Sequence, residues 1–119
     1  MHPGAILLAE DEVLIRLDMV DQLRQAGFRV FAVANGDEAM KVLQKLGSDF
    51  ALVITDVRMP GRTDGAALAA WIRHERPGIK VMLISAHPLS QVSAHADASM
   101  EKPVIASKLI ERVKQLLAQ

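Results

Sequence analysis

Three short apolar runs set the strongest limit on how this chain can fold. They are rich in Val, Ile and Leu and lie at Ala5–Ala9 (AILLA), Ala51–Thr55 (ALVIT) and Lys80–Ser85 (KVMLIS). A run of this length without alternating polar residues is typical of a strand that is buried on both faces. Such strands occur mainly in parallel sheets that helices cover on both sides. The runs therefore predict an α/β fold.

The segments between these runs have the spacing of amphipathic helices. Helices are predicted at Leu14–Arg24 ended by Gly27, at Asp37–Leu46 ended by Gly47, at Asp64–Arg76, and from Ile105 to Leu117. The Leu and Met residues on the helical faces are interpreted as core residues. Weak alternation at Phe28–Val33 predicts one more strand, and a fourth helix and a fifth strand must fit within His87–Met100.

Strand and helix alternate along the whole chain, which predicts a doubly wound parallel sheet with helices on both faces and right-handed crossovers. A chain of 119 residues is long enough for one compact domain and too short for two of ordinary size, so residues 1–119 are expected to form a single domain. Sheets of this kind bind ligands at the carboxyl ends of their strands. Functional residues are therefore expected there.

Composition excludes several classes of function. The chain has 14 basic and 14 acidic residues and no run of Lys or Arg, so a broad basic surface for nucleic acid is not expected. It has no cysteine, which excludes a disulfide scaffold and fits a cytoplasmic location. No stretch approaches the roughly 18 apolar residues of a membrane span. Neither nucleic acid nor membrane is an expected partner.

Three acidic residues stand at the ends of two predicted strands. Glu10 and Asp11 follow the first apolar run, and Asp56 closes the run that contains Ile54 and Thr55. In a parallel sheet these carboxylates would share one rim, where their like charges repel. Either their pKa values rise, or a bound cation neutralises them. Mg²⁺ suits an open cleft of this kind because it accepts one or two carboxylates and keeps several waters. The alternative is that each acid is a helix N-cap or a turn residue.

Two further strand ends supply complementary groups. Ser85 offers a hydroxyl and Lys102, just before Pro103, offers an ammonium. A carboxylate that attacks phosphorus forms an acyl phosphate, and a metal, a lysine and a hydroxyl would stabilise charge on the transferred oxygens. Taken singly, Ser85 is typical of a cap and Lys102 of a solvated surface charge. Their joint placement favours a phosphoryl site.

Together these residues resemble the receiver domains of two-component response regulators, the CheY-like superfamily. The resemblance covers nearly the whole chain. Its motifs stand in family order: Glu10 and Asp11, Asp56 within ITDVRMPG, Asp64 and Gly65, Ser85 and Ala86, and Lys102 with Pro103.

The resemblance implies a fold and a mechanism. The fold is flavodoxin-like, with five parallel strands in the order 2-1-3-4-5. Mg²⁺ would be held by Asp11, Asp56 and the backbone carbonyl of Arg58, with Glu10 assisting through water. Asp56 would accept a phosphoryl group from a sensor histidine kinase or a histidine phosphotransfer protein. The chain would then be a phosphoacceptor with at most slow autodephosphorylation, acting on an unknown downstream protein.

By the same resemblance, Ser85 and Lys102 turn toward the phosphoryl group and pass the change to the face built by the last helices. The family usually has an aromatic residue three positions before the lysine, where this chain has Ser99. The stretch between Ser85 and Lys102 is also shorter than in the family. We therefore expect the fourth helix to be short or disordered and His87–Met100 to be the most mobile segment.

Two residues near the expected pocket have open interpretations. Arg58 either leans over the pocket and tunes the lifetime of the acyl phosphate or points into solvent. His87 is a candidate for the pocket entrance. His2, His74 and His95 show no metal-ligand spacing, so no zinc site is expected.

Other functions compete with this interpretation. A dinucleotide or flavin binder would have a glycine-rich loop after the first strand, where this chain has Glu-Asp-Glu and no GxGxxG motif. A haloacid-dehalogenase-like phosphatase would have a second Asp two residues after the nucleophile, where Arg58 stands. Two alternatives stay open: a docking module that signals without phosphorylation, and a receiver excised from a hybrid histidine kinase.

Overall fold

A computed structural model describes residues 4–86 and 95–118 and contains a five-stranded parallel sheet in the order β2-β1-β3-β4-β5. Every neighbouring pair is parallel. The strands are β1 (Ala5–Ala9), β2 (Val30–Val33), β3 (Phe50–Asp56), β4 (Lys80–Ser85) and β5 (Ala98–Glu101). This confirms the predicted sheet and its strand order.

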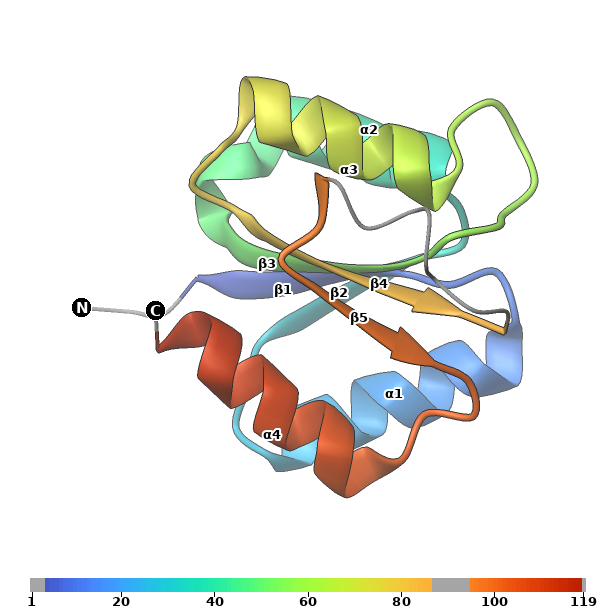
Figure 1. Ribbon diagram of the computed structural model, residues 1–119, viewed down its shortest axis with the longest axis vertical. Coiled ribbons are helices and arrows are strands. Elements are labelled where there is room, and N and C mark those ends of the chain that lie inside the picture. The colour runs from blue at the N-terminus through green and yellow to red at the C-terminus, as the bar shows by residue number, and fades with distance from the viewer. Residues whose placement is uncertain (1–3, 87–94, 119) are drawn as a thin grey trace.

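Helices cover both faces of the sheet, with α2 and α3 on one side and α1 and α4 on the other (Figure 1). They are α1 (Val13–Gln25), α2 (Gly36–Leu46), α3 (Gly65–Glu75) and α4 (Ala106–Leu117), and a short 3₁₀ helix, η1 (Gly47–Asp49), precedes β3. The flavodoxin-like α/β prediction is therefore confirmed. The helix expected before β5 is predicted within His87–Met100, and residues 87–94 of that stretch, with the candidate His87, lie outside the described residues.

The sheet separates two hydrophobic cores. Successive side chains of a strand point to opposite faces, so Val53 packs under α2 and α3 while Ile54 packs under α1 and α4. Leu83 and Met82 divide in the same way. All four side chains are 0% exposed. Burial of each such side chain stabilises the fold by about 1.5–3 kcal/mol, which explains why the central strands are apolar runs.

The interpretation of all helical Leu residues as core is wrong for the first half of α1. Leu14 is 82% exposed and Leu17 is 59% exposed. The buried residues of this helix are Met19 and Leu23, which stand one helical turn apart and face the sheet. The apolar side chains near the start of α1 therefore lie on the protein surface.

The second strand begins at Val30 and not at Phe28, because the preceding residues cap α1. Gly27 has a φ of 96°, a left-handed conformation that favours glycine. Its N–H donates to the Arg24 carbonyl (2.9 Å), and the Phe28 N–H donates to the Leu23 carbonyl (3.1 Å). This is the Schellman arrangement, which satisfies helix-end carbonyls before the chain can join the sheet.

Helix α2 ends at Gly47 as predicted, but Gly47 is right-handed, with φ −54° and ψ −34°, and continues into η1. A Cβ at Gly47 would lie 2.7 Å from Nε of Arg76, so the glycine makes room for that side chain. Helix α3 lies just inside its predicted range because Asp64 is its N-cap, accepting the N–H of Ala67 at 2.8 Å.

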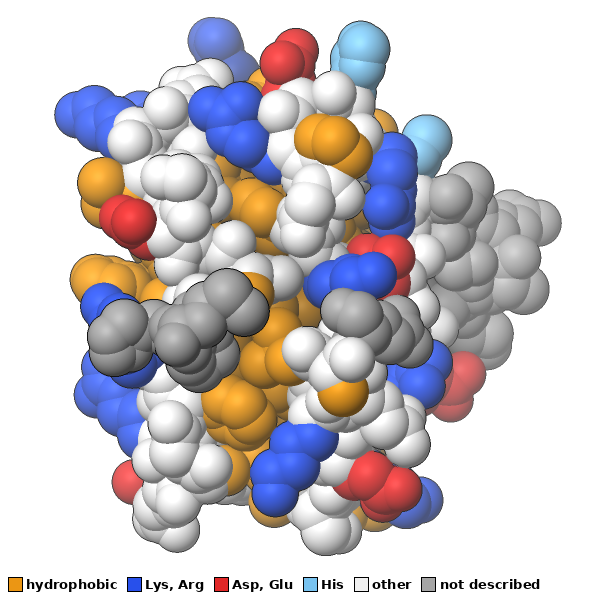
Figure 2. All heavy atoms as spheres, turned by 90° about the vertical axis from the view of Figure 1, so that its left-hand side faces the viewer, with side chains coloured by type: hydrophobic (Ala, Val, Ile, Leu, Met, Phe, Trp, Pro, Cys, Tyr) orange, Lys and Arg blue, Asp and Glu red, His pale blue; other side chains and the backbone are white. Residues whose placement is uncertain are grey.

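The side of the molecule where the strands begin carries mixed charge. Figure 2 shows Lys and Arg side chains around a central band of hydrophobic side chains, with Asp and Glu among them. A surface of this kind has no broad region of one sign.

Within residues 4–86 and 95–118, none of the helices combines the length and the apolar character that a membrane crossing demands.

The start of α2 packs directly against the chain that precedes α3, and this contact generates a stability prediction. A Cβ at Gly36 would overlap the carbonyl oxygen of Thr63, whereas a Cβ at Gly78 would meet nothing within 4 Å. Gly36→Ala is expected to destabilise the protein by about 1–3 kcal/mol through overpacking, and Gly78→Ala by less than about 0.5 kcal/mol. Urea unfolding of both variants measures this, and equal losses would contradict it.

Candidate functional site

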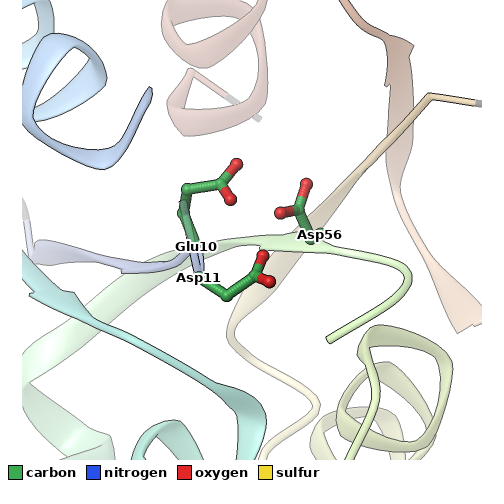
Figure 3. Close-up of side chains that lie close together, drawn as sticks. All are labelled: Glu10, Asp11 and Asp56. Atoms are coloured by element: carbon green, nitrogen blue, oxygen red, sulfur yellow. The ribbon is translucent and has the colours of Figure 1, made fainter. Parts of the chain in front are cut away.

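Three carboxylates meet at the carboxyl edge of the sheet because β1 and β3 are neighbours. Ala9 pairs with Thr55, so the residues that follow, Glu10 and Asp56, stand side by side. One carboxylate oxygen from each of Glu10, Asp11 and Asp56 lies within 4.8 Å of the other two. Figure 3 shows the three carboxylates directed toward one another. The prediction that these acids share one rim is confirmed.

Two of these acids are buried, which shifts their proton affinities. Glu10 is 1% exposed and Asp56 is 5% exposed. Burial and the neighbouring Glu10 raise the pKa of Asp56 to about 8, although Lys102 acts in the opposite direction. Burial also acts to raise the pKa of Glu10, but hydrogen bonds with Asp56, the Glu12 N–H and Lys102 outweigh it and lower that pKa. The proton affinity of Asp56 is thus raised while that of Glu10 is lowered.

Lys102 supplies the opposite charge at this edge. Its Nζ lies 3.1 Å from Oε1 of Glu10 and 3.0 Å from Oδ1 of Asp56. Partial burial acts to lower the pKa of Lys102, but its hydrogen bonds with Asp56 and Glu10 and their charges raise it. The side chain is therefore a cation that bridges the two buried acids.

Ser85 ends β4, beside the strand that carries Asp56, and is 8% exposed. Its carbonyl accepts the backbone N–H of Lys102 at 2.8 Å, which fixes the chain beyond β5 against β4. Arg58 is exposed at the same edge. A pocket of about 180 Å³ is lined by Asp11, Glu12, Asp56, Arg58, Ile84, Ser85, Ala86 and Lys102. The structure thus gathers the predicted residues that it describes, and their individual roles stay predictions.

Sequence reasoning missed the groups that hold Glu10 in place. The Glu12 N–H donates to Oε2 of Glu10 at 3.0 Å, and Nη1 of Arg16 donates to the Glu10 carbonyl at 2.8 Å. No sequence motif marks either contact, because both depend on how the β1–α1 turn closes. Ser99, at the position where the family usually has an aromatic residue, is an exposed residue of β5 opposite Leu83.

The donor set fits a small hard cation. The three clustered ligand atoms are all carboxylate oxygens, which Mg²⁺ prefers, and no His of residues 4–86 or 95–118 lines the pocket of this cysteine-free chain. Each water takes about 30 Å³ of liquid volume, so a pocket of about 180 Å³ has room for an ion that keeps several waters. Lys102 balances only one negative charge of this cluster, so the acidic charge that remains favours binding of a further cation.

Comparison with known proteins gives relatives along almost the entire chain. CpdR, a response regulator receiver protein of Brucella abortus, is 32% identical over 117 residues, covering 94% of this chain and 95% of CpdR. The transcriptional regulatory protein PdtaR of Mycobacterium tuberculosis is 35% identical over 94% of this chain and 56% of PdtaR. The sensor kinase CckA of Brucella abortus is 32% identical over 96% of this chain. The chain spans only 12% of CckA and about half of PdtaR.

Solved structures give the same result. A response regulator receiver protein from Sinorhizobium medicae has a TM-score of 0.88 and 34% identity, covering 98% of this chain and 96% of that chain. The response regulator TrrA of Thermotoga maritima was solved in complex with Mg(2+)-BeF. It has a TM-score of 0.84 and 32% identity, and the match covers 95% of this chain and 98% of TrrA.

The family assignment rests on sequence, fold and site together. Residues 6–114 match the response regulator receiver domain family. The sheet order and the acidic pocket of Glu10, Asp11 and Asp56 agree with that match. This chain therefore belongs to the response regulator receiver domain family.

Proposed function

We propose that this chain is the phosphoacceptor of a two-component signalling system and that it changes conformation when Asp56 is phosphorylated. The phosphoryl donor would be a histidine of a sensor kinase or of a histidine phosphotransfer protein. The observation that carries this proposal is the position of Asp56, a buried carboxylate between two other acids and Lys102 on the wall of an open pocket.

The metal in this proposal is Mg²⁺, held by Asp11, Asp56 and the backbone carbonyl of Arg58, with Glu10 acting through water. When bound, Mg²⁺ neutralises charge on the phosphoryl oxygens and holds them in line for transfer. The carboxylate cluster supports this assignment. Further support is that TrrA, 32% identical, was solved with Mg(2+)-BeF.

In the proposed reaction an Oδ atom of Asp56 attacks phosphorus. The new P–O bond forms as the P–N bond of the donor phosphohistidine breaks, and the imidazole takes the bonding electron pair. Lys102, with Nζ 3.0 Å from Oδ1, would stabilise charge on the phosphoryl oxygens, and the Ser85 hydroxyl would donate to one of them. Moving Lys102 from Glu10 to the phosphoryl group would shift the chain that follows β5 and so change the α4 side of the molecule.

The proposed role is that of a phosphoacceptor with at most slow autodephosphorylation, and Arg58 at the pocket is a candidate for tuning that rate. The relatives point to two settings. CpdR, which the chain nearly spans, favours a regulator of this size. The match to a short part of the sensor kinase CckA favours the second candidate, a receiver that belongs to a hybrid kinase. The downstream partner would differ between them.

Phosphorylation itself has a direct test. Incubation with acetyl phosphate and Mg²⁺ should add one phosphoryl group to the wild type and none to Asp56→Asn, because the amide cannot form an acyl phosphate. Intact-mass spectrometry with and without Mg²⁺ measures the adduct. Omitting Mg²⁺ is the control and should abolish it. A failure of the wild type with every phosphoryl donor would favour a docking module instead.

The raised pKa of Asp56 predicts a pH-dependent metal affinity. Because the group carries a proton below about pH 8, Mg²⁺ must displace that proton to bind. The dissociation constant should therefore rise by up to about tenfold for each pH unit below 8 and level off above it. Calorimetric titrations between pH 6 and 9 measure this. Asp56→Asn should bind more weakly with little pH dependence, and a flat wild-type profile would contradict the assignment.

Lys102 is expected to transmit the switch. Lys102→Ala should leave Asp56 able to accept phosphate, because the nucleophile and the carboxylate cluster remain, but should suppress the conformational response. NMR spectra before and after addition of beryllofluoride measure that response. The exposed Lys108 on α4 offers a matched control, since Lys108→Ala should respond like the wild type. Wild-type shifts in α4 of Lys102→Ala would refute the role.

A further inference from the structure

The connection between β3 and α3 carries Arg58, whose carbonyl is a ligand in the proposed metal site. Its first part is anchored to the sheet and the core. The Val57 N–H donates to the Ile84 carbonyl (2.9 Å), the Gly65 N–H donates to the Val57 carbonyl (2.8 Å), and Met59 packs against the core under α2 and α3. Residues 60–62 are exposed, so their position depends on contacts made from elsewhere.

Asp37 makes those contacts from the first turn of α2. Its Oδ2 accepts the N–H of Arg62 at 3.1 Å and its Oδ1 accepts the N–H of Thr63 at 2.9 Å. Gly61 has a φ of 101°, and a Cβ at that position would lie 2.6 Å from Oδ2 of Asp37. The carboxylate is thus seated against the backbone of residues 61–63, which are distant from it in sequence.

The N-terminus of α2 does not need Asp37 as a cap. Asn35 is the N-cap, and its Oδ1 accepts the Glu38 N–H at 2.8 Å. Oε1 of Glu38 in turn accepts the N–H of Ala34, the residue before the cap, at 3.0 Å. The hydrogen bonds of Asp37 go instead to the connection. Hydrogen bonds from the Thr63 side chain and from the Arg62 N–H lower the pKa of Asp37, so the contact is made by a charged carboxylate at neutral pH.

We propose that Asp37 is a positioning residue of the metal site: by holding residues 61–63 on α2 it fixes the end of the connection that follows Arg58 and so limits the movement of the Arg58 carbonyl. This inference rests on the proposed function, because it needs Mg²⁺ to bind at Asp11 and Asp56. Pro60, with its fixed φ, lies between the two ends of the connection and stiffens the link from Thr63 back to Arg58. Loss of the anchor would give the ligand carbonyl more freedom, and Mg²⁺ binding would have to restrict it again.

The test compares Asp37→Ala with Glu38→Ala. Both changes remove one acidic side chain from the first turn of α2 and one acceptor of backbone N–H groups, but only Asp37 reaches the β3–α3 connection. Asp37→Ala should weaken Mg²⁺ binding about tenfold, as loss of support for metal ligands typically does. Glu38→Ala should stay within about twofold of the wild type. Asp37→Asn, which keeps one acceptor oxygen, should fall between the wild type and Asp37→Ala.

A readout without metal separates positioning from a general loss of stability. In the metal-free protein, Asp37→Ala should speed amide exchange at Arg62 and Thr63 by at least tenfold, while Glu38→Ala should not. Urea titration should show that the two variants have similar unfolding free energies. Equal Mg²⁺ affinity of Asp37→Ala and wild type, or unchanged exchange at these amides, would overturn the inference alone. Absence of Mg²⁺ binding by the wild type would overturn the proposed function and this inference with it.

Discussion

The parallel pairing of β1 with β3 is the constraint on which the rest of this structure depends. It sets Ala9 opposite Thr55, so the chain leaves both strands at the same level and places Glu10 beside Asp56. A slip of one residue would turn every side chain of a strand to the other face, so that the side chains of each core would no longer match the helices that pack on it. The same apolar side chains that stabilise the sheet therefore also fix the acidic cluster, because core and site share one register.

That cluster is a poor arrangement for stability alone. Glu10 and Asp56 are buried together, and Lys102 is the cation that lies within 4 Å of both among the residues that the structure describes. Burying an ion pair costs a desolvation free energy that the attraction between the charges often does not recover. Replacing these residues with hydrophobic residues of similar size would therefore be expected to give an equally stable fold. Buried charged clusters of this kind are found mainly at functional sites, where the chemistry needs shifted pKa values and charges held in fixed positions. The raised pKa of Asp56 is what this arrangement produces.

The sequence was sufficient for the sheet and the acids, because both follow from local patterns: buried strands appear as unbroken Val, Ile and Leu runs, and Asp56 stands where one run ends. It was not sufficient where a contact joins distant segments. The bonds of Asp37 to Arg62 and Thr63 depend on how two turns meet, and no periodicity encodes that. Exposed Leu14 was mistaken for core because spacing identifies an apolar position without showing whether another element covers it.

The sheet divides the molecule into two layers, each with its own core, and this has a consequence for communication. Side chains in one layer do not mix with those in the other, so a packing change under α3 has no direct route to α1. The carboxyl edge is different, because Arg16 of α1, Asp37 of α2 and the segment that leads into α4 all make contacts there. A charge added at that edge would therefore lie close to elements of both layers, whereas a change within one core would meet the sheet before it reached the other.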